Sequence, residues 1–192
     1  MITNDKAIIR KEMLEKRRAL SKDECRVMSE TICRRFLETD EYRNADTILL
    51  YKAYNNEVIT DLIFEQAAAD GKKVAYPLSK IADGEPVMTF YVTEDIAQLQ
   101  SGYKGIMEPD ITKHPEPFEG SADICITPGV AFDRKCHRIG YGKAFYDRYI
   151  RLNAPRKVIG LAYEMQIADD FRPEDTDRSV DMVITEKTVY RK

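Results

Sequence analysis

Short apolar runs alternate along this chain with longer segments in which apolar residues recur at helical spacing. Runs with the length and composition of strands lie at 47–51, 74–76, 88–92, 124–126, 158–161 and 182–185. Because predicted strands and helices alternate, the pattern predicts an α/β fold whose sheet has substantial parallel pairing. The carboxyl ends of parallel strands share one edge of a sheet, and ligands collect at that edge.

Two helices are predicted before the first strand. The first begins at a cap formed by Thr3 or Asn4 and runs to about Ala19. Ser21 and Glu24 then form a capping-box pattern that begins the second helix. The inward face of this second helix is predicted to carry four apolar residues: Cys25, Met28, Ile32 and Phe36.

The first helix is crowded with cations. They are Lys6, Arg10, Lys11, Lys16, Arg17 and Arg18. The ordinary expectation for such a helix is a solvated basic face. Lys6 and Arg10, however, are four residues apart, so they lie on one side of the helix and can reach one anion together.

Turn-forming residues set several further boundaries. Thr60 or Asp61 is predicted to cap a helix, and Pro77 to end the strand at 74–76. Asp83-Gly84 predicts a turn before the strand at 88–92. A later helix is predicted from about Lys143, because Phe145, Tyr149 and Leu152 recur at helical spacing.

Composition excludes several classes of protein. The chain of 192 residues is 43% hydrophobic and 33% charged, which is ordinary for a single globular domain. A net charge of −3 and a pI of about 5.6 do not favour nucleic-acid binding. No apolar run approaches the ~20 residues of a membrane span, and the amino terminus lacks the pattern of a signal peptide. Four cysteines without a CxxC pair, and only two histidines, make a zinc site unexpected and favour a reducing cytoplasm.

The stretch 123–148 carries the strongest chemical signal. A short apolar run ends at Thr127, and a loop rich in glycine and cations leads from it into the helix predicted from about Lys143. Amide N–H groups of such a loop and of a helix amino terminus bind phosphate, and nearby cations complete the site. Asp133 and Asp147 supply carboxylates, one of which is suited to Mg²⁺ beside a phosphate. The stretch contains neither a P-loop nor GxGxxG, since residue 145 is Phe, and a tight turn with solvated charges remains an alternative.

Two strings within this stretch, PGVAFD at 128–133 and HRIGYGKAFYDR at 137–148, closely resemble the signature of the 5-formyltetrahydrofolate cyclo-ligase family. The resemblance implies one domain over residues 1–192 with a Rossmann-like three-layer sandwich. It also implies the ATP- and Mg²⁺-dependent conversion of 5-formyltetrahydrofolate to 5,10-methenyltetrahydrofolate, with release of ADP and phosphate. Such a reaction needs no protein nucleophile, and Lys143 and Arg138 are the best candidates for stabilising charge on the phosphoryl group.

The resemblance also assigns residues to ligands. The residues expected to bind ATP are Lys6, Arg10, Arg138, Ile139, Gly140, Tyr141, Gly142, Lys143, Ala144, Phe145 and Tyr146. Those expected to bind the folate substrate are Lys52, Glu57, Tyr141 and Phe145, and those expected to bind metal are Asp147 and Asp181. Ala144 stands where the family usually has glycine, a change expected to cost little at a helix start. Phe145 stands where the family has tyrosine, so it keeps the ring and loses the hydroxyl.

Three other functions remain open on the residues alone. One is a different enzyme on a similar sheet, such as a sugar-phosphate isomerase or a CoA-transferase. Another is a folate- or nucleotide-binding protein without turnover. A third is nucleic-acid binding through the basic first helix, which salt-dependent RNA binding would reveal. Our expectation is an enzyme that acts on two small molecules, binds neither nucleic acid nor membrane, and is a monomer.

Overall fold

The computed structural model describes residues 6–102, 105–113, 115–169, 171–174 and 176–192. Its α-helices are α1 (Lys6–Arg18), α2 (Lys22–Leu37), α3 (Asp40–Arg43), α4 (Asp61–Ala69) and α5 (Phe145–Asn153). Short 3-10 helices are η1 (Ile96–Gln98), η3 (Ile111–Lys113) and η4 (Glu164–Gln166). The proposed caps Thr3 and Asn4 lie outside the described residues.

Seven strands form one mixed sheet in the order β11-β10-β9-β6-β1-β2-β3. These strands are β1 (Thr47–Leu49), β2 (Lys73–Ala82), β3 (Glu85–Val92), β6 (Ile124–Thr127), β9 (Lys157–Leu161), β10 (Met182–Ile184) and β11 (Val189–Arg191). The five strands from β10 to β2 pair in parallel, and β3 and β11 add antiparallel edges. Two small sheets join β4 (Leu99–Ser101) to β5 (Met107–Pro109) and β7 (Ala131–Phe132) to β8 (Arg138–Ile139).

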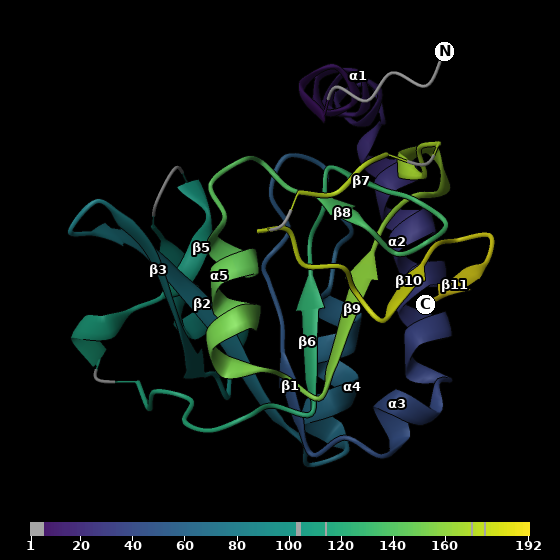
Figure 1. Ribbon diagram of the computed structural model, residues 1–192. Coiled ribbons are helices and arrows are strands. Elements are labelled where there is room, and N and C mark those ends of the chain that lie inside the picture. The colour runs from purple at the N-terminus through teal and green to yellow at the C-terminus, as the bar shows by residue number, and fades with distance from the viewer. Residues whose placement is uncertain (1–5, 103–104, 114, 170, 175) are drawn as a thin grey trace.

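Helices cover both faces of the sheet, so the fold is the expected three-layer α/β sandwich (Figure 1). On one face, apolar residues of α2 and α4 pack on β1, β6, β9 and β10 in the largest core cluster, which includes Ile32, Phe36 and Ile63. On the other face, Tyr149 of α5 packs beside Phe90 of β3, with ring centroids 4.7 Å apart. The capping box of Ser21 and Glu24 begins α2 as predicted.

Two glycines allow the chain after β6 to pack tightly on the sheet. The ring of Phe132 lies between Gly129 and Gly160 and is fully buried. A Cβ placed on either glycine would come within 2.4–2.5 Å of that ring, which no real contact permits. The β7–β8 hairpin is therefore held against β9, within the segment that the sequence predicted to be an irregular loop.

One other prediction about the elements was wrong. Pro77 does not end its strand, because β2 continues through it to Ala82 and pairs with β3. β1 pairs only with residues 73–75 of β2, so the ring of Pro77 blocks no bond to β1. The helix predicted from the spacing of Phe145, Tyr149 and Leu152 is present as α5, in which Tyr149 is buried and Leu152 is exposed.

Candidate functional site

The candidate site lies where the connections from β1 and β6 diverge, at the carboxyl ends of these neighbouring strands. α4 follows β1 and covers one face of the sheet, whereas α5 follows β6 and covers the other. Ligands of open α/β sheets bind at such a switch point. Residues 50–57 follow β1, residues 128–144 follow β6, and α1 packs above both on β7 and η4.

Arg17 of α1 joins these segments to one another. Its side chain is only 1% exposed. Its Nε donates to the carbonyl oxygen of Asn55 at 2.9 Å, and Nη1 donates to that of Gly129 at 3.2 Å. Nη2 donates to the hydroxyl of Tyr141, and the guanidinium carbon lies 5.6 Å from the centroid of that tyrosine ring. One side chain thus links the segment after β1 to two parts of the segment after β6: Gly129 near its start and residues 140–144 at its end, which we call the glycine loop.

Glu57 and Tyr141, two residues expected to bind folate, meet at this point. The carboxylate of Glu57 accepts from the backbone N–H of Tyr54 at 3.0 Å and is hydrogen-bonded to Tyr141. Burial raises the pKa of Glu57 to about 7, although the positive charge of Arg17 opposes the shift. Burial and the charge of Glu57 likewise raise the pKa of Tyr141 to about 12. Glu57 is therefore a buried carboxylate that titrates near neutral pH.

The buried Arg138 and the half-buried Asp147 form an ion pair. Arg138 is 5% exposed, and its Nη2 lies 2.9 Å from Oδ2 of Asp147. The guanidinium also lies 5.7 Å from the ring centroid of Tyr146. Its Nε has no hydrogen-bond partner among the described residues, although it is buried. A buried donor without a partner is costly unless a ligand or water satisfies it.

The two predicted cations of α1 point to different groups. Arg10 reaches the glycine loop, where its Nε donates to the carbonyl oxygen of Gly140 at 2.8 Å. Lys6 instead forms ion pairs with Glu174, at 3.0 Å, and with Asp177. Partial burial would lower the pKa of Lys6, but its hydrogen bonds to these two carboxylates outweigh that effect and raise the pKa. The helix thus faces the loop, but Lys6 is held by acidic side chains.

The glycine loop ends at Ala144, which caps α5 in a left-handed conformation with φ 54° and ψ 15°. The expectation that alanine costs little here was wrong, because an L-residue in this region is strained by about 1–2 kcal/mol. Ala144 occupies the cap position of α5, and its side chain makes no capping hydrogen bond to the helix. The first amide groups of α5 are therefore open to an anion.

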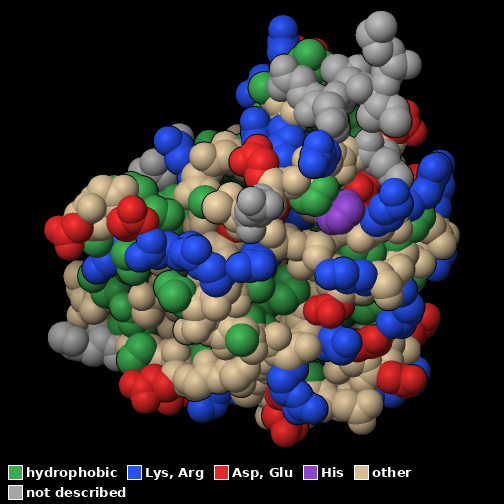
Figure 2. Space-filling view, viewed as in Figure 1, with side chains coloured by type: hydrophobic (Ala, Val, Ile, Leu, Met, Phe, Trp, Pro, Cys, Tyr) green, Lys and Arg blue, Asp and Glu red, His purple; other side chains and the backbone are tan. Residues whose placement is uncertain are grey.

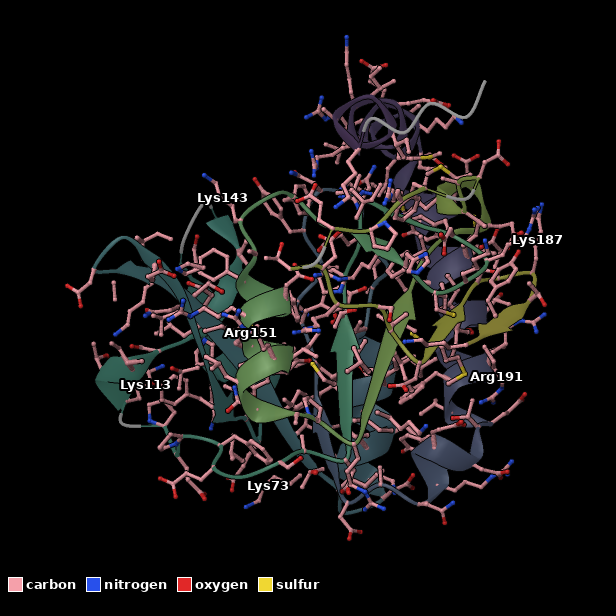
Figure 3. The ribbon with its side chains drawn as sticks, viewed as in Figure 1. Lys73, Lys113, Lys143, Arg151, Lys187 and Arg191 are labelled. Carbon is pink, nitrogen blue, oxygen red and sulfur yellow. The ribbon has the colours of Figure 1, made fainter. Side chains whose placement is uncertain are left out.

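The other predicted residues lie around this centre. Ile139 is buried in β8, whereas Phe145 is half-buried at the start of α5. Lys143 is exposed and stands beside the start of α5 in Figure 3. Lys52 follows β1 and forms an ion pair with Asp61 at 2.5 Å, at the start of α4.

Asp181, the second predicted metal ligand, does not lie with Asp147. It precedes β10 at the amino end of the sheet, where its Oδ2 accepts from the backbone N–H of Val158 at 2.8 Å. It also lines a hollow of about 250 Å³ together with Glu41, Lys157 and Arg191. Within the described ranges, no three Asp, Glu, His or Cys side chains form a group suited to a metal ion.

Arg17 is the site residue that the sequence analysis left in the solvated basic face. A signal for it does exist, since Arg10, Met13 and Arg17 are three and four residues apart and share one face of α1. Met13 is buried against Ile139 and Phe171, so the same face that docks the helix also carries Arg17 inward. Periodicity places the three residues together, but it does not show that this face meets polar loops.

Comparisons with known proteins agree over nearly the whole chain. A sequence model of the 5-formyltetrahydrofolate cyclo-ligase family matches residues 2–186. The 5-formyltetrahydrofolate cyclo-ligase of Mus musculus is 25% identical over 194 residues, which cover 96% of this chain and 95% of the mouse protein.

Two solved structures have the same fold. The 5,10-methenyltetrahydrofolate synthetase of Aquifex aeolicus has a TM-score of 0.82 at 31% identity, covering 97% of this chain and 92% of its own. The corresponding synthetase of Mycoplasma pneumoniae has a TM-score of 0.73 at 28% identity, covering 95% and 99%. The chain therefore belongs to the 5-formyltetrahydrofolate cyclo-ligase family.

Proposed function

We propose that this protein catalyses the ATP-dependent conversion of 5-formyltetrahydrofolate to 5,10-methenyltetrahydrofolate, with release of ADP and phosphate. Family membership supports the reaction. The observation that carries the proposal in this chain is that Arg17 hydrogen-bonds to Tyr141 and to the loop after β1, beside the buried carboxylate of Glu57. This arrangement joins a carboxylate suited to a pterin to a glycine loop suited to phosphate.

The phosphate end of the site consists of backbone amides and cations. Gly140, Gly142 and the open first turn of α5 offer N–H groups, and Arg10 lies against the loop. The unpartnered Nε of Arg138 suits an anionic ligand. Lys143 is exposed at the end of the loop, and we propose that it closes on the γ-phosphate.

The folate end is organised around Glu57. A pterin presents amino and ring N–H donors, and an ionised carboxylate is an acceptor for two of them. Tyr141 and the half-buried Phe145 provide aromatic surface beside it. Lys52 is held by Asp61, and we propose for it only a peripheral contact with the substrate.

The chemistry asks the protein to position two ligands and to neutralise charge. The formyl oxygen attacks the γ-phosphorus of ATP and ADP leaves, which gives an iminium phosphate. N10 then attacks the formyl carbon, loses its proton, and inorganic phosphate carries away the former formyl oxygen. Arg10, Arg138 and Lys143 stabilise the charge on the transferred phosphoryl group, and no protein nucleophile takes part.

Mg²⁺ is the proposed cofactor, and Asp147 is the predicted ligand that lies beside the proposed phosphate site, where its Oδ1 accepts from the backbone N–H of Arg178 and its Oδ2 pairs with Arg138. Mg²⁺ usually keeps several waters and takes one or two carboxylates beside substrate phosphates. Asp147 lies in the first turn of α5, next to the proposed phosphate site, whereas Asp181 lies at the other end of the sheet. When bound, the ion neutralises charge on the phosphates.

A direct assay tests this function. Protein, MgATP and 5-formyltetrahydrofolate are mixed, and methenyltetrahydrofolate is followed by its absorbance while ADP is measured in parallel. We expect equal amounts of the two products. A folate-binding protein without turnover would bind 5-formyltetrahydrofolate and give neither product.

We propose a reducing cytoplasm as the compartment, which four free buried cysteines support.

A further inference from the structure

We propose that Arg17 is the positioning residue of the folate subsite: it fixes Tyr141 in place and sustains the negative charge of Glu57. The proposal rests on the function proposed above, since it assumes that Glu57 binds the pterin. It assigns a role to a residue that the sequence placed among solvated cations.

The first support is geometric. All three nitrogens of the Arg17 guanidinium donate to groups of the site, namely two backbone carbonyls and the Tyr141 hydroxyl. A second residue holds the same loop, because Nε2 of Gln166 donates to the carbonyl oxygens of Gly129 and Val130, both at 2.9 Å. Gln166 is neutral, so Arg17 alone combines this role with a positive charge.

The second support is the set of groups around Glu57. Arg17 is the cation that acts on its carboxylate, and the other neighbours are hydroxyl or amide groups. Tyrosines approach from four segments: Tyr51, Tyr141, Tyr146 and Tyr163. Tyr54 adds a backbone N–H. Because neutral groups stabilise a buried charge less than a cation does, removing Arg17 favours the protonated, uncharged form of Glu57.

A protonated Glu57 would bind the pterin poorly. An uncharged carboxyl group donates one hydrogen bond and accepts fewer, whereas the pterin edge offers donors. The carboxylate form predominates above the pKa of Glu57, about 7. KM for 5-formyltetrahydrofolate should therefore rise as the pH falls through about 7 in the unmodified protein, and at a higher pH without Arg17.

The experiment compares Arg17→Met with Arg17→Lys and Arg18→Met, measuring kcat and both KM values from about pH 6 to pH 9. For Arg17→Met we expect KM for the folate to rise about tenfold near neutral pH. We also expect the pH midpoint of the change in KM for the folate to move up by about one unit or more, with KM for ATP little changed. Arg17→Lys keeps the charge but not the three bonds, so its midpoint should stay while KM rises. Arg18 is exposed, and Arg18→Met should behave as the unmodified protein.

Two outcomes would overturn the role of Arg17: an unmoved midpoint in Arg17→Met, or an equal rise in KM for both substrates. If Arg17→Met does not fold, Arg17→Gln decides, because its amide removes the charge but keeps N–H donors for the neighbouring oxygens. An unmoved midpoint in Arg17→Gln would then refute the proposal. Equilibrium dialysis with 5-formyltetrahydrofolate separates the two proposals. If binding follows the expected pH shifts but no product forms, only the proposed reaction is contradicted. If product forms without those pH shifts, only the role proposed for Arg17 is contradicted.

Discussion

The two ends of the parallel strands carry charges in different ways. At the carboxyl end, Arg17, Arg138 and Glu57 are 1%, 5% and 6% exposed. At the amino end, the side chains of Arg156 and Arg191 are 74% and 57% exposed in their pairs with Asp123 and Glu41. Burying a charge costs desolvation free energy that an exposed ion pair does not lose. We therefore interpret the buried charges as groups that the site requires. The difference marks the carboxyl end as the working end of the fold.

The face of the molecule visible in Figure 2 carries charges of both signs. Figure 2 shows acidic side chains interspersed among the Lys and Arg of the visible face. In Figure 3, Arg191 lies on β11, far from Lys143 and the start of α5.

None of the helices among the described residues has the length and hydrophobicity of a membrane span.

Removing a cation at each end is the strongest test of this contrast. Arg138→Met removes a buried cation from the half-buried Asp147, which still accepts from the backbone N–H of Arg178, and we expect a loss of about 1–3 kcal/mol in the free energy of unfolding together with loss of turnover. Arg156→Met removes an exposed cation from Asp123 and should cost about 0–1 kcal/mol. Urea unfolding of both variants measures the effect. Equal losses would mean that the two ends do not differ in the way described.

Removing a carboxylate at each end tests the metal assignment. Asp147→Asn should lower Mg²⁺-dependent turnover by about 10- to 100-fold, because a neutral amide binds the ion weakly. Its effect on folding should be smaller, since the amide oxygen can still accept from Arg138. Asp181→Asn keeps an acceptor for the N–H of Val158 and should leave turnover nearly unchanged.

The measurement is initial rate against Mg²⁺ concentration, with thermal unfolding as a control for folding. Unchanged activity in Asp147→Asn would remove the metal assignment of that residue. A large loss in Asp181→Asn would show instead that the amino end takes part.

The two ends of α5 offer the smallest and most closely matched test. Ala144 and Ala154 flank the helix, and both are left-handed, with φ 54° and φ 42°. Replacing either by glycine relieves strain but adds freedom to the unfolded chain, and we expect a net gain of about 1 kcal/mol from each. Differential scanning calorimetry would show a rise of about 2–4 °C in Tm. Only Ala144→Gly should also change KM for ATP, because Ala154 lies at the amino end of the sheet.

The sequence predicted what depends on local pattern and on the family signature. The alternation of strands and helices, the capping box at Ser21 and the loop after Thr127 follow from residue types at short range. The burial of Arg17, the position of Asp181 and the continuation of β2 through Pro77 do not. Each of these depends on which surface a segment meets, and chain periodicity carries no such information.

The docking of α1 has a consequence for how the protein is made. Its buried residue Met13 packs against Ile139 and Phe171, which lie far later in the chain, and the helix contacts η4. Its partners are synthesised only after most of the chain has emerged. The docking face of α1 is therefore buried only after β8 and Phe171 have been synthesised, so the part of the site that Arg17 joins is assembled late.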